Sequence, residues 1–358
     1  MRTWQLGLVA GLVAGLGWGC GGAAASPDDD LYDIPVAAPS PTARQRGPQP
    51  EPTVGDVEGG GELAGPDTGS AASDPASSDP APSGEGPSER EPGAAALRGL
   101  TAAGELSEAE LMAALAQARA VCFGETHDNA AHHRAQARAA SELAARARDA
   151  GAPFALGFEM FQTPFQTVLT SFALGSIDEP QLLQGSEYAT RWGYDFEFYR
   201  PLLELAREYQ LPALALNAPA ELTRKIADQG LDGLSAEERA SLPELDLNDA
   251  EHRAYVSEQL GAFHSSDEAS LDNPYAVQVV WDETMAETAS EWLSSNGEDA
   301  RLLIIAGLGH CHRSAVPSRI TRRTGAAVLA VGPVLASRLG APGFPTLEQY
   351  DLLVVIDD

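Results

Sequence analysis

The chain has 358 residues and a formal net charge of −29, from 52 acidic and 23 basic residues. A surface this acidic repels phosphate groups, so the composition excludes a general nucleic-acid-binding protein. The length would allow two domains of ordinary size, but the first quarter of the chain lacks the apolar residues that a packed core requires.

Residues Met1–Gly19 predict a secretory signal peptide. One positive charge, Arg2, precedes a run of apolar residues and glycines from Leu6 to Gly19, which is shorter than the ~20 residues of a membrane span. Small residues then stand beside Cys20, which resembles the cleavage box of bacterial lipoproteins, so we expect Cys20 to become the lipidated first residue. The alternative is a plain signal peptide with an incidental cysteine. Gly21 follows in place of an aspartate, which by analogy with bacterial sorting rules favours the outer membrane of the cell envelope.

Residues 20–93 predict a disordered acidic tether. They consist almost wholly of proline, glycine, serine, alanine and acidic residues, with Tyr32 as the only aromatic residue. Such a segment cannot bury enough apolar surface to offset the entropy of ordering it, and proline and charge repulsion extend it. The remaining residues, 94–358, form one domain that is large enough for a substantial core and that the tether holds away from the membrane.

Apolar strands alternate with helices along this domain. The predicted strands are Arg119–Phe123, Phe154–Phe158, Pro212–Leu216, Leu302–Ala306, Ala326–Val331 and Leu352–Ile356. The predicted helices are Ser107–Ala118, Asn129–Arg148, Thr163–Ala173, Asp178–Gln184, Tyr199–Tyr209, one opened by Pro219, Asp232–Leu242, Ala250–Phe263, Asn273–Asn296 and Pro317–Thr324.

The strands are apolar throughout, which is typical of a mostly parallel sheet covered by helices on both faces, and hence of an α/β fold. The first two strands and the helix between them predict a βαβ unit with a parallel pair of strands. Residues 230–272 carry no strand signal, so their helices predict a helical insertion or cap subdomain.

Polar residues follow the strands. They are Gly124 and Glu125, with His127 close behind, then Glu159, Asn217 and Gly307–His310. Because the carboxyl ends of parallel strands meet at one edge of a sheet, where ligands bind, we expect Glu125, His127, Glu159, Asn217 and His310 to converge. Carboxylate and imidazole groups with an open position can bind a divalent transition metal or act as general acid and base.

Most of these residues also have a purely structural interpretation. Glu125 can stabilise the start of the following helix, Asn217 can be a helix cap, and His310 can be a loop histidine with its own hydrogen bonds. His132 and His133 must point in different directions on a helix, so we expect one to face the site and the other to be solvated.

The segment Tyr188–Tyr199 is the densest aromatic stretch of the chain, with Trp192, Tyr194, Phe196 and Phe198 at alternate positions. Its structural interpretation is a cap packed on the core. The functional interpretation is a wall for a flat apolar ligand, with a tyrosine phenol as an iron ligand, as in some haem proteins. No Cys-x-x-Cys-His motif occurs, so any haem would be bound non-covalently.

Cys122 and Cys311 each lie beside a candidate site residue. In an oxidising compartment they could form a disulfide, because both are predicted at the same end of the sheet. Two buried free thiols are the alternative.

Six segments together resemble the ChaN-like family of haem-binding lipoproteins, which belongs to the wider Tiki/TraB-type superfamily. In chain order they read GETHDNAAHHRAQ, GFEMF, RWGYDFEFYRPLLELAR, LPALALNAP, QVVWDETMAE and AGLGHCHRSAVPSRI, and they span about Arg119–Ile320. The resemblance implies an α/β fold with a helical subdomain, a membrane-anchored lipoprotein of haem or iron uptake, and haem or iron binding, which a homodimer interface could provide.

The resemblance makes Gly124–His127 and Gly307–His310 the defining motifs. It implies haem binding by Tyr194, His132, His133, Asn217, Gly124 and Gly309, with Tyr188 and Tyr199 as alternatives to Tyr194. Superfamily relatives include metal-dependent proteases and an antibiotic esterase. A metal-dependent hydrolase is therefore the second hypothesis, with Glu125, His127, Glu159 and His310 as metal ligands and catalytic groups. Residues Cys311–Arg313 replace the smaller residues expected there, and their thiol or imidazole could add a ligand.

Overall fold

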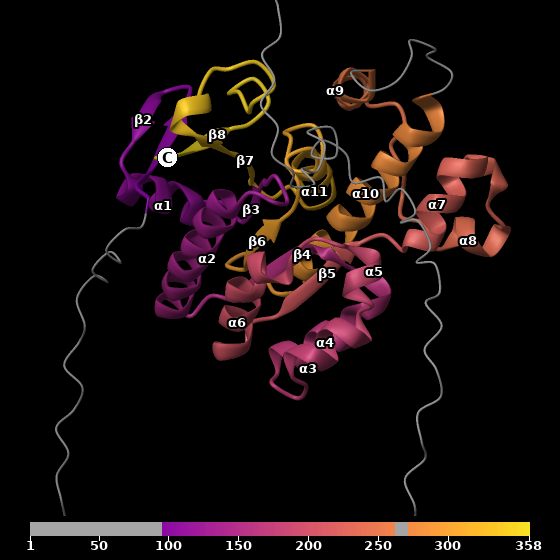
Figure 1. The fold of residues 1–358 in the computed structure, drawn as a ribbon, viewed down its shortest axis with the longest axis horizontal. Helices are drawn as coiled ribbons and strands as arrows, with labels where there is room; N and C mark the ends of the chain where they lie inside the picture. The colour runs from indigo at the N-terminus through magenta and orange to yellow at the C-terminus, as the bar shows by residue number, and fades with distance from the viewer. Residues whose placement is uncertain (1–94, 262–270) are drawn as a thin grey trace, which may run out of the picture. The chain divides into compact units, whose positions relative to one another are not determined.

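The computed structural model describes residues 95–261 and 271–358 (Figure 1). The predicted signal peptide, the lipidated Cys20, the tether and the end of the helix predicted to reach Phe263 lie outside these residues. No helix within the described ranges is both long enough and apolar enough to cross a membrane.

Eight strands form a single sheet with the order β2-β1-β8-β7-β3-β6-β4-β5. The strands are β1 Leu97–Thr101, β2 Gly104–Leu106, β3 Ala120–Phe123, β4 Phe154–Gln162, β5 Ala213–Asn217, β6 Arg301–Ile305, β7 Val328–Leu335 and β8 Leu352–Ile356. All neighbouring strands from β8 to β5 pair in parallel, and the hairpin of β1 and β2 adds an antiparallel edge. The predicted mostly parallel α/β fold is confirmed.

The strands β3 and β4 of the predicted βαβ unit are parallel but are not neighbours. β6 lies between them, with Ile304 opposite both Cys122 in β3 and Gly157 in β4. The prediction that they pair directly is therefore wrong. The reason is that β6 is almost wholly buried, and a strand buried on both faces lies at the centre of a parallel sheet, with a neighbouring strand on each side. The chain leaves β3 toward β4 and β5 and later fills the opposite side with β7 and β8. Such a reversal of strand order is where open α/β sheets bind ligands.

The β1–β2 hairpin was not predicted. Its strands are short and interrupted by Gly99 and Gly104, so they carry neither an apolar run nor a clear alternation. The hairpin joins the sheet through the pairing of β1 with β8, in the register Leu97 to Ile356, and local sequence cannot show such a long-range contact.

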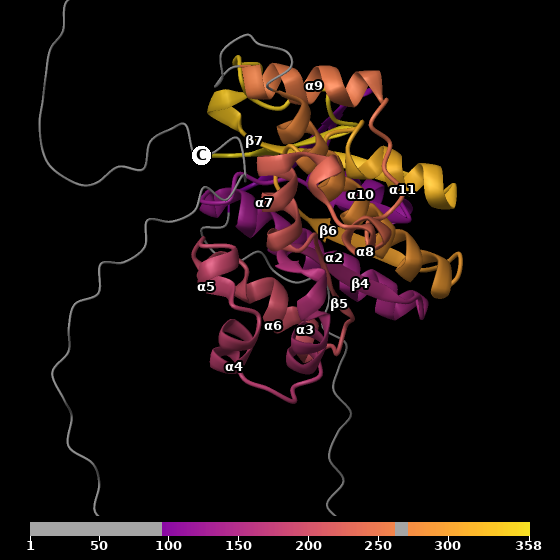
Figure 2. The ribbon, with the colours of Figure 1, turned by 90° about the vertical axis from the view of Figure 1, so that its right-hand side faces the viewer.

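Helices cover both faces of the sheet (Figures 1 and 2). The helices are α1 Glu108–Gln117, α2 Ala130–Ala150, α3 Gln166–Ala173, α4 Glu179–Gly185, α5 Tyr188–Arg191, α6 Arg200–Glu208, α7 Ala220–Gln229, α8 Ala236–Ala240, α9 Ala250–Gly261, α10 Asp272–Ser295 and α11 Val316–Thr324. One apolar core contains residues of α1, α2, α3 and α6, and the other contains residues of α7, α10 and α11.

The alternation of side chains along β3 explains the two cores. Val121 and Phe123 point into the core under α2, whereas Ala120 and Cys122 point into the core under α10 and α11. Between α7 and α10 the chain forms the short α8 and then α9, in the region where a helical insertion is predicted. The predicted helix Asp232–Leu242 is reduced to a 3-10 turn, Leu231–Gly233, followed by α8.

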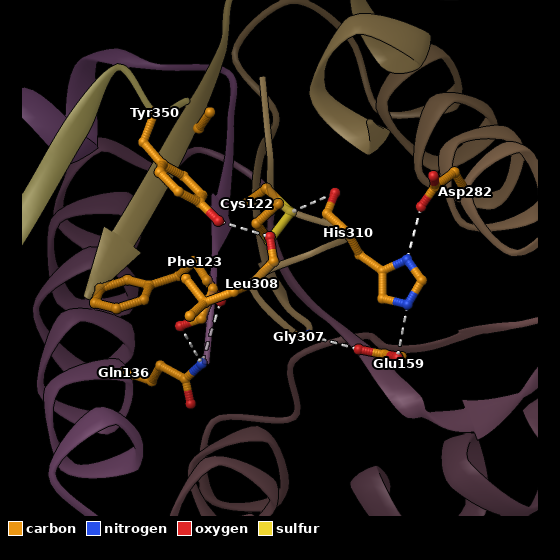
Figure 3. The surroundings of a disulfide bond; sticks show 12 residues. Cys122, Phe123, Gln136, Glu159, Asp282, Gly307, Leu308, His310 and Tyr350 are labelled. Carbon is orange, nitrogen blue, oxygen red and sulfur yellow. Dashed lines mark hydrogen bonds and ion pairs between the residues drawn. A yellow bond between two sulfur atoms is a disulfide. The ribbon is translucent and has the colours of Figure 1, made fainter. Parts of the chain in front are cut away.

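A disulfide joins Cys122 in β3 to Cys311 in the loop after β6 (Figure 3). Of the two alternatives for these cysteines, the structure therefore has the disulfide and not the two free thiols. The bridge spans 189 positions of sequence. In the chain-entropy model, a cross-link over so long a loop restricts the unfolded chain strongly, by about 5 kcal/mol as an upper figure.

We predict that the double variant Cys122→Ala/Cys311→Ala has a free energy of unfolding lower than that of the native chain by about 2–5 kcal/mol, because its unfolded state is no longer constrained. Urea denaturation followed by circular dichroism measures this difference. A reducing agent should destabilise the native chain and leave the double variant unchanged. Equal midpoints for the two oxidised proteins would show that the bridge does not stabilise the fold.

Candidate functional site

A cavity of about 410 Å³ lies where the chain leaves β3 and β6. The loop before α2 and the Gly307–His310 loop form its floor, α9 and the start of α10 contribute one wall, and the segment after β7 contributes another. Its lining includes Glu125, Thr126, His127, His132, Tyr255, Gln278, Leu308, His310, Pro333, Arg338 and Phe344.

Glu125 is a buried carboxylate held by three neighbours. Its Oε1 atom accepts hydrogen bonds from Nδ1 of His127 at 2.8 Å and from the Tyr199 hydroxyl at 2.7 Å. Its Oε2 atom lies 3.4 Å from Nδ1 of His133. Burial alone would raise the pKa of Glu125, but these neighbours hold it below its usual value. Glu125 is therefore ionised, and it orients the imidazole of His127.

A second buried chain of ionisable groups starts at Glu159 and runs into the helices (Figure 3). One oxygen of Glu159 accepts a hydrogen bond from the Gly307 backbone N–H at 2.6 Å, and the other lies 3.1 Å from Nε2 of His310. Nδ1 of His310 lies 2.7 Å from Asp282 on α10. The other oxygen of Asp282 lies 2.9 Å from Nε2 of His252 on α9.

His310 is positively charged in this arrangement, because each of its ring nitrogens faces a carboxylate. Burial by itself disfavours the imidazolium, but Glu159 and Asp282 raise the pKa of His310 to about 10. The pKa of Asp282 is lowered: burial opposes this shift, and the hydrogen bonds with His252 and His310 outweigh it. A doubly protonated imidazole has no lone pair for a metal, so His310 acts here as a hydrogen-bond donor.

The polar chain continues beyond the site. Nδ1 of His252 lies 3.0 Å from the guanidinium of Arg319 on α11, and Arg319 lies 3.2 Å from Glu283 on α10. Arg319, Asp282 and Glu283 are all fully buried. The carboxyl ends of the strands are thus joined to α9, α10 and α11 by a chain of buried polar contacts.

The Gly307–His310 loop is fixed from several sides. Leu308 N–H donates to the Glu125 carbonyl at 2.9 Å, and the Leu308 carbonyl accepts from the Tyr350 hydroxyl at 2.9 Å (Figure 3). Gly307 lies directly against His127: an added Cβ at Gly307 would sit 3.0 Å from Cε1 of the imidazole. The two glycine-containing motifs therefore pack against each other, and a larger residue at position 307 would separate them.

The structure brings together four of the five residues expected to converge: Glu125, His127, Glu159 and His310. Asn217 is not among the residues that line the cavity, because it lies in the edge strand β5, beyond β4. Its Oδ1 atom instead accepts a hydrogen bond from the Ala218 N–H at 2.8 Å.

The predicted metal ligands do not form a metal centre. Within residues 95–261 and 271–358, no group of three or more His, Cys, Asp or Glu side chains is arranged to hold a metal ion. Protein partners take up the relevant lone pairs: His310 is bonded at both nitrogens, and Glu159 accepts from the Gly307 backbone. The divalent-metal alternative has no support in the described structure.

Both histidines at the start of α2 are buried, so the expectation that one of them is solvated is wrong. His133 stacks on Phe198 with ring centroids 4.6 Å apart, and its Nε2 donates to the His127 carbonyl. Nδ1 of His132 accepts a hydrogen bond from the Thr126 N–H at 3.0 Å. The reason for the burial of His133 is that Phe198 and Tyr199, from the aromatic segment after α5, pack on its ring, which sequence periodicity does not reveal.

Of the three tyrosines considered as iron ligands, Tyr194 is placed differently from the others. Tyr188 and Tyr199 are buried, and burial raises the pKa of both phenols, which disfavours the phenolate that would bind iron. Tyr194 is half-buried, with its ring centroid 4.9 Å from that of His127 and 5.5 Å from that of Trp192. Partly buried Trp192, Tyr194 and Phe198 also pack on the core, as the structural interpretation of this segment predicts.

The residues after His310 are structural. Cys311 is in the disulfide, and His312 stacks on Tyr255 with centroids 3.8 Å apart while its Nδ1 bonds to Ser314. Burial lowers the pKa of His312 to about 4. Neither residue is therefore placed as an additional ligand.

Sequence reasoning missed the roles of four polar residues of the site. Tyr199, considered only as an iron ligand, donates a hydrogen bond to Glu125. The other three are His252, Asp282 and Gln136, whose amide donates to the carbonyls at the end of β3. All come from helices or their edges and reach the site only through tertiary packing. The one signal for Asp282 was its place in the QVVWDETMAE segment of the family resemblance.

We predict that Asp282→Asn lowers the free energy of unfolding by about 3–5 kcal/mol at pH 7, because it leaves the buried imidazoles of His310 and His252 without their shared carboxylate. Chemical denaturation measures the difference. The matched control is Asp272→Asn on the same helix, whose exposed pair with Arg253 is worth about 0–1 kcal/mol.

The same variant should change the pH dependence of stability. His310 has a raised pKa in the folded protein, so its stabilising contribution is complete below about pH 6.5 and is lost as the pH rises through about 10. The loss of stability between these pH values should be smaller in Asp282→Asn than in the native chain. Identical pH profiles would contradict the charged state assigned to His310.

Comparison with known proteins places the chain in a family. The family model described as haem-binding uptake, Tiki superfamily, ChaN matches residues 111–320, and the chain belongs to this family. A search of curated proteins finds no match.

Among solved structures, ChaN of Campylobacter jejuni, described as binding haem cofacially, matches with a TM-score of 0.58 and 16% identity over 73% of this chain and 97% of that chain. This likeness shows the fold. The type III effector HopBA1 has a TM-score of 0.39 and 14% identity over 69% of this chain and 91% of that chain. An erythromycin esterase mutant in its open conformation has a TM-score of 0.38 and 13% identity over 70% and 78%. At these two TM-scores the likeness supports no inference about this chain.

Proposed function

We propose that this protein is a haem-binding lipoprotein of the bacterial cell envelope, anchored in the outer membrane through Cys20 and active in haem or iron uptake. Membership of the haem-binding uptake family supports the ligand class. The signal-like start of the chain and the acidic tether support the anchor. A homodimer, with haem at its interface, remains a prediction from the family resemblance.

The observation that carries the proposal is the position of Tyr194. Tyr194 is only half-buried, and its ring packs beside Trp192 and beside His127, which lines the cavity. Flat aromatic and imidazole groups offer a surface for a planar ligand, and a tyrosinate can serve as an axial ligand of haem iron. The residues therefore fit a non-covalently bound haem, with Tyr194 as the iron ligand.

The histidines of α2 have a different role in this proposal from the one expected. Nε2 of His133 is bonded to a backbone carbonyl, and its ring is covered by Phe198. His132 uses Nδ1 as an acceptor, so its proton resides on Nε2, which then has no lone pair for iron. In this proposal both histidines stabilise the site through their hydrogen bonds and do not coordinate iron.

We predict that adding haemin to the purified protein produces a shifted Soret band, and that Tyr194→Phe weakens binding at least tenfold because the iron loses its phenolate ligand. Absorption titration measures both effects. The control is Tyr209→Phe, which changes an exposed tyrosine at the end of α6 and should bind as the native chain does.

Two results would contradict this proposal. Unaltered haemin binding by Tyr194→Phe would remove Tyr194 as the ligand. No haemin binding by the native chain, together with turnover of peptide or ester substrates, would favour the hydrolase alternative. The structural feature behind that alternative is the pair of carboxylate–imidazole contacts, Glu125 with His127 and Glu159 with His310.

The membrane anchor has a separate test. We predict that Cys20→Ser moves the protein from the membrane fraction to the soluble fraction of the expressing bacterium, because a lipidated cysteine supplies the anchor. Fractionation followed by immunoblotting measures the distribution. The variant Gly21→Ala, which leaves the cysteine in place, should stay with the membranes. Retention of Cys20→Ser in the membrane fraction would contradict the anchor.

A further inference from the structure

The disulfide between Cys122 and Cys311 ties together the two loops that carry the motifs of the site (Figure 3). Cys122 is the last residue but one of β3, and Cys311 directly follows His310. The pairing of β3 with β6 ends at Phe123 and Ile305, and the loop after β6 has left the sheet when it reaches Cys311. The bridge is thus a covalent link between the two motifs beyond the point where strand pairing stops.

The bridge is inaccessible in the folded protein. Both cysteines have an exposed fraction of 0% and belong to the second apolar core. A thiolate must reach a sulfur atom to cleave a disulfide, so a bridge in this position persists once the fold has formed. The compartment in which the chain folds therefore decides its state: a reducing cytoplasm leaves two thiols, and an oxidising compartment closes the bridge.

The state of the bridge affects the loop that carries His310. Two unbonded sulfur atoms stand farther apart than two bonded ones, and a close-packed core passes such a displacement to its neighbours. The imidazole of His310 lies between Glu159 and Asp282. In the same loop, the Leu308 N–H donates to the Glu125 carbonyl at 2.9 Å. A displaced loop therefore disturbs both motifs at once.

A short series of contacts leads from this loop to the proposed iron ligand. A Cβ added at Gly307 would sit 3.0 Å from Cε1 of His127, so the loop lies directly against that imidazole. The ring centroid of His127 is in turn 4.9 Å from that of Tyr194. The cysteines act on the ligand only through these residues, which makes them positioning residues.

We propose that the disulfide between Cys122 and Cys311 is a redox switch that makes the site competent for its ligand only after the chain folds in an oxidising compartment. The two thiols lose two protons and two electrons as the Sγ–Sγ bond forms, and these reduce the disulfide of a thiol oxidant to two thiols. The inference rests on the proposed function, which supplies the ligand and the cell-envelope location. The reduced chain takes up little haem in the cytoplasm, whereas the exported, oxidised chain binds it.

The test compares the two redox forms of the full chain carrying Cys20→Ser, in which Cys122 and Cys311 are the only cysteines. The reduced form is obtained by unfolding in urea with a reductant, refolding, and removing both without oxygen. Absorption titration should show that it binds haemin about tenfold more weakly than the oxidised form, an effect expected of residues that act on a site through others. The oxidised form, treated with the same reductant without urea, should keep its bridge and its affinity.

Two variants separate positioning from stability. Cys122→Ala/Cys311→Ala should bind haemin weakly after either treatment, because nothing ties the loop to β3. Leu293→Ala is the control matched for stability, since truncating a fully buried leucine destabilises a fold about as much as losing a disulfide. Leu293 lies at the other end of β3, where its carbonyl accepts from Arg119. This variant should bind haemin as the native chain does and still respond to reduction.

Hydrogen exchange measures the state of the loop without a ligand. The Leu308 amide, bonded to the Glu125 carbonyl, should exchange faster in the reduced form. The Arg301 amide, bonded to the Pro153 carbonyl at the start of β6, should exchange equally in both forms.

Equal haemin affinity of the two redox forms would overturn the inference and leave the proposed haem binding intact. An unfolded reduced chain by circular dichroism, or equally weak binding by Leu293→Ala, would also overturn it, because the bridge would then act through stability alone. If the oxidised chain does not bind haemin, the proposed function fails, and the exchange of Leu308 decides: faster exchange on reduction supports the switch, and equal exchange overturns it.

Discussion

The contact on which the site depends is the placement of the His310 imidazole between two buried carboxylates, Glu159 at 3.1 Å and Asp282 at 2.7 Å. Burying these charges costs free energy, which is recovered only if every group keeps its partners. The second oxygen of Glu159 has the Gly307 N–H as its partner, and the second oxygen of Asp282 has His252. As a result, the central strands of the sheet and the helices α9 and α10 have fixed positions relative to one another, and the cavity lies between them.

The same network determines which chemistry the inner site can perform. His310 is held as a cation, and His127 is bonded to Glu125, so the imidazoles nearest the strand ends serve the protein's own hydrogen bonds. A metal held by these groups would have to displace several short contacts. Ligand binding is therefore better served by the groups around this network, such as Tyr194, whose ring packs beside His127.

Much of this arrangement could be predicted from the sequence. Strands that are apolar throughout indicate a parallel sheet, and the polar residues behind them, such as Glu125 and Glu159, could be assigned to one edge by topology alone. What could not be predicted depends on contacts between distant segments. The insertion of β6 between β3 and β4, the burial of both His132 and His133, and the role of Asp282 follow from packing that has no local pattern.

The central claim is that iron is bound outside the Glu–His network, at Tyr194, while the network remains intact. Anomalous diffraction at the iron absorption edge, from crystals of the haemin-loaded protein, tests it most directly. The account predicts one iron peak within bonding distance of the Tyr194 phenol oxygen, with His310 still between Glu159 and Asp282. An iron peak among Glu125, His127, Glu159 and His310 would contradict it.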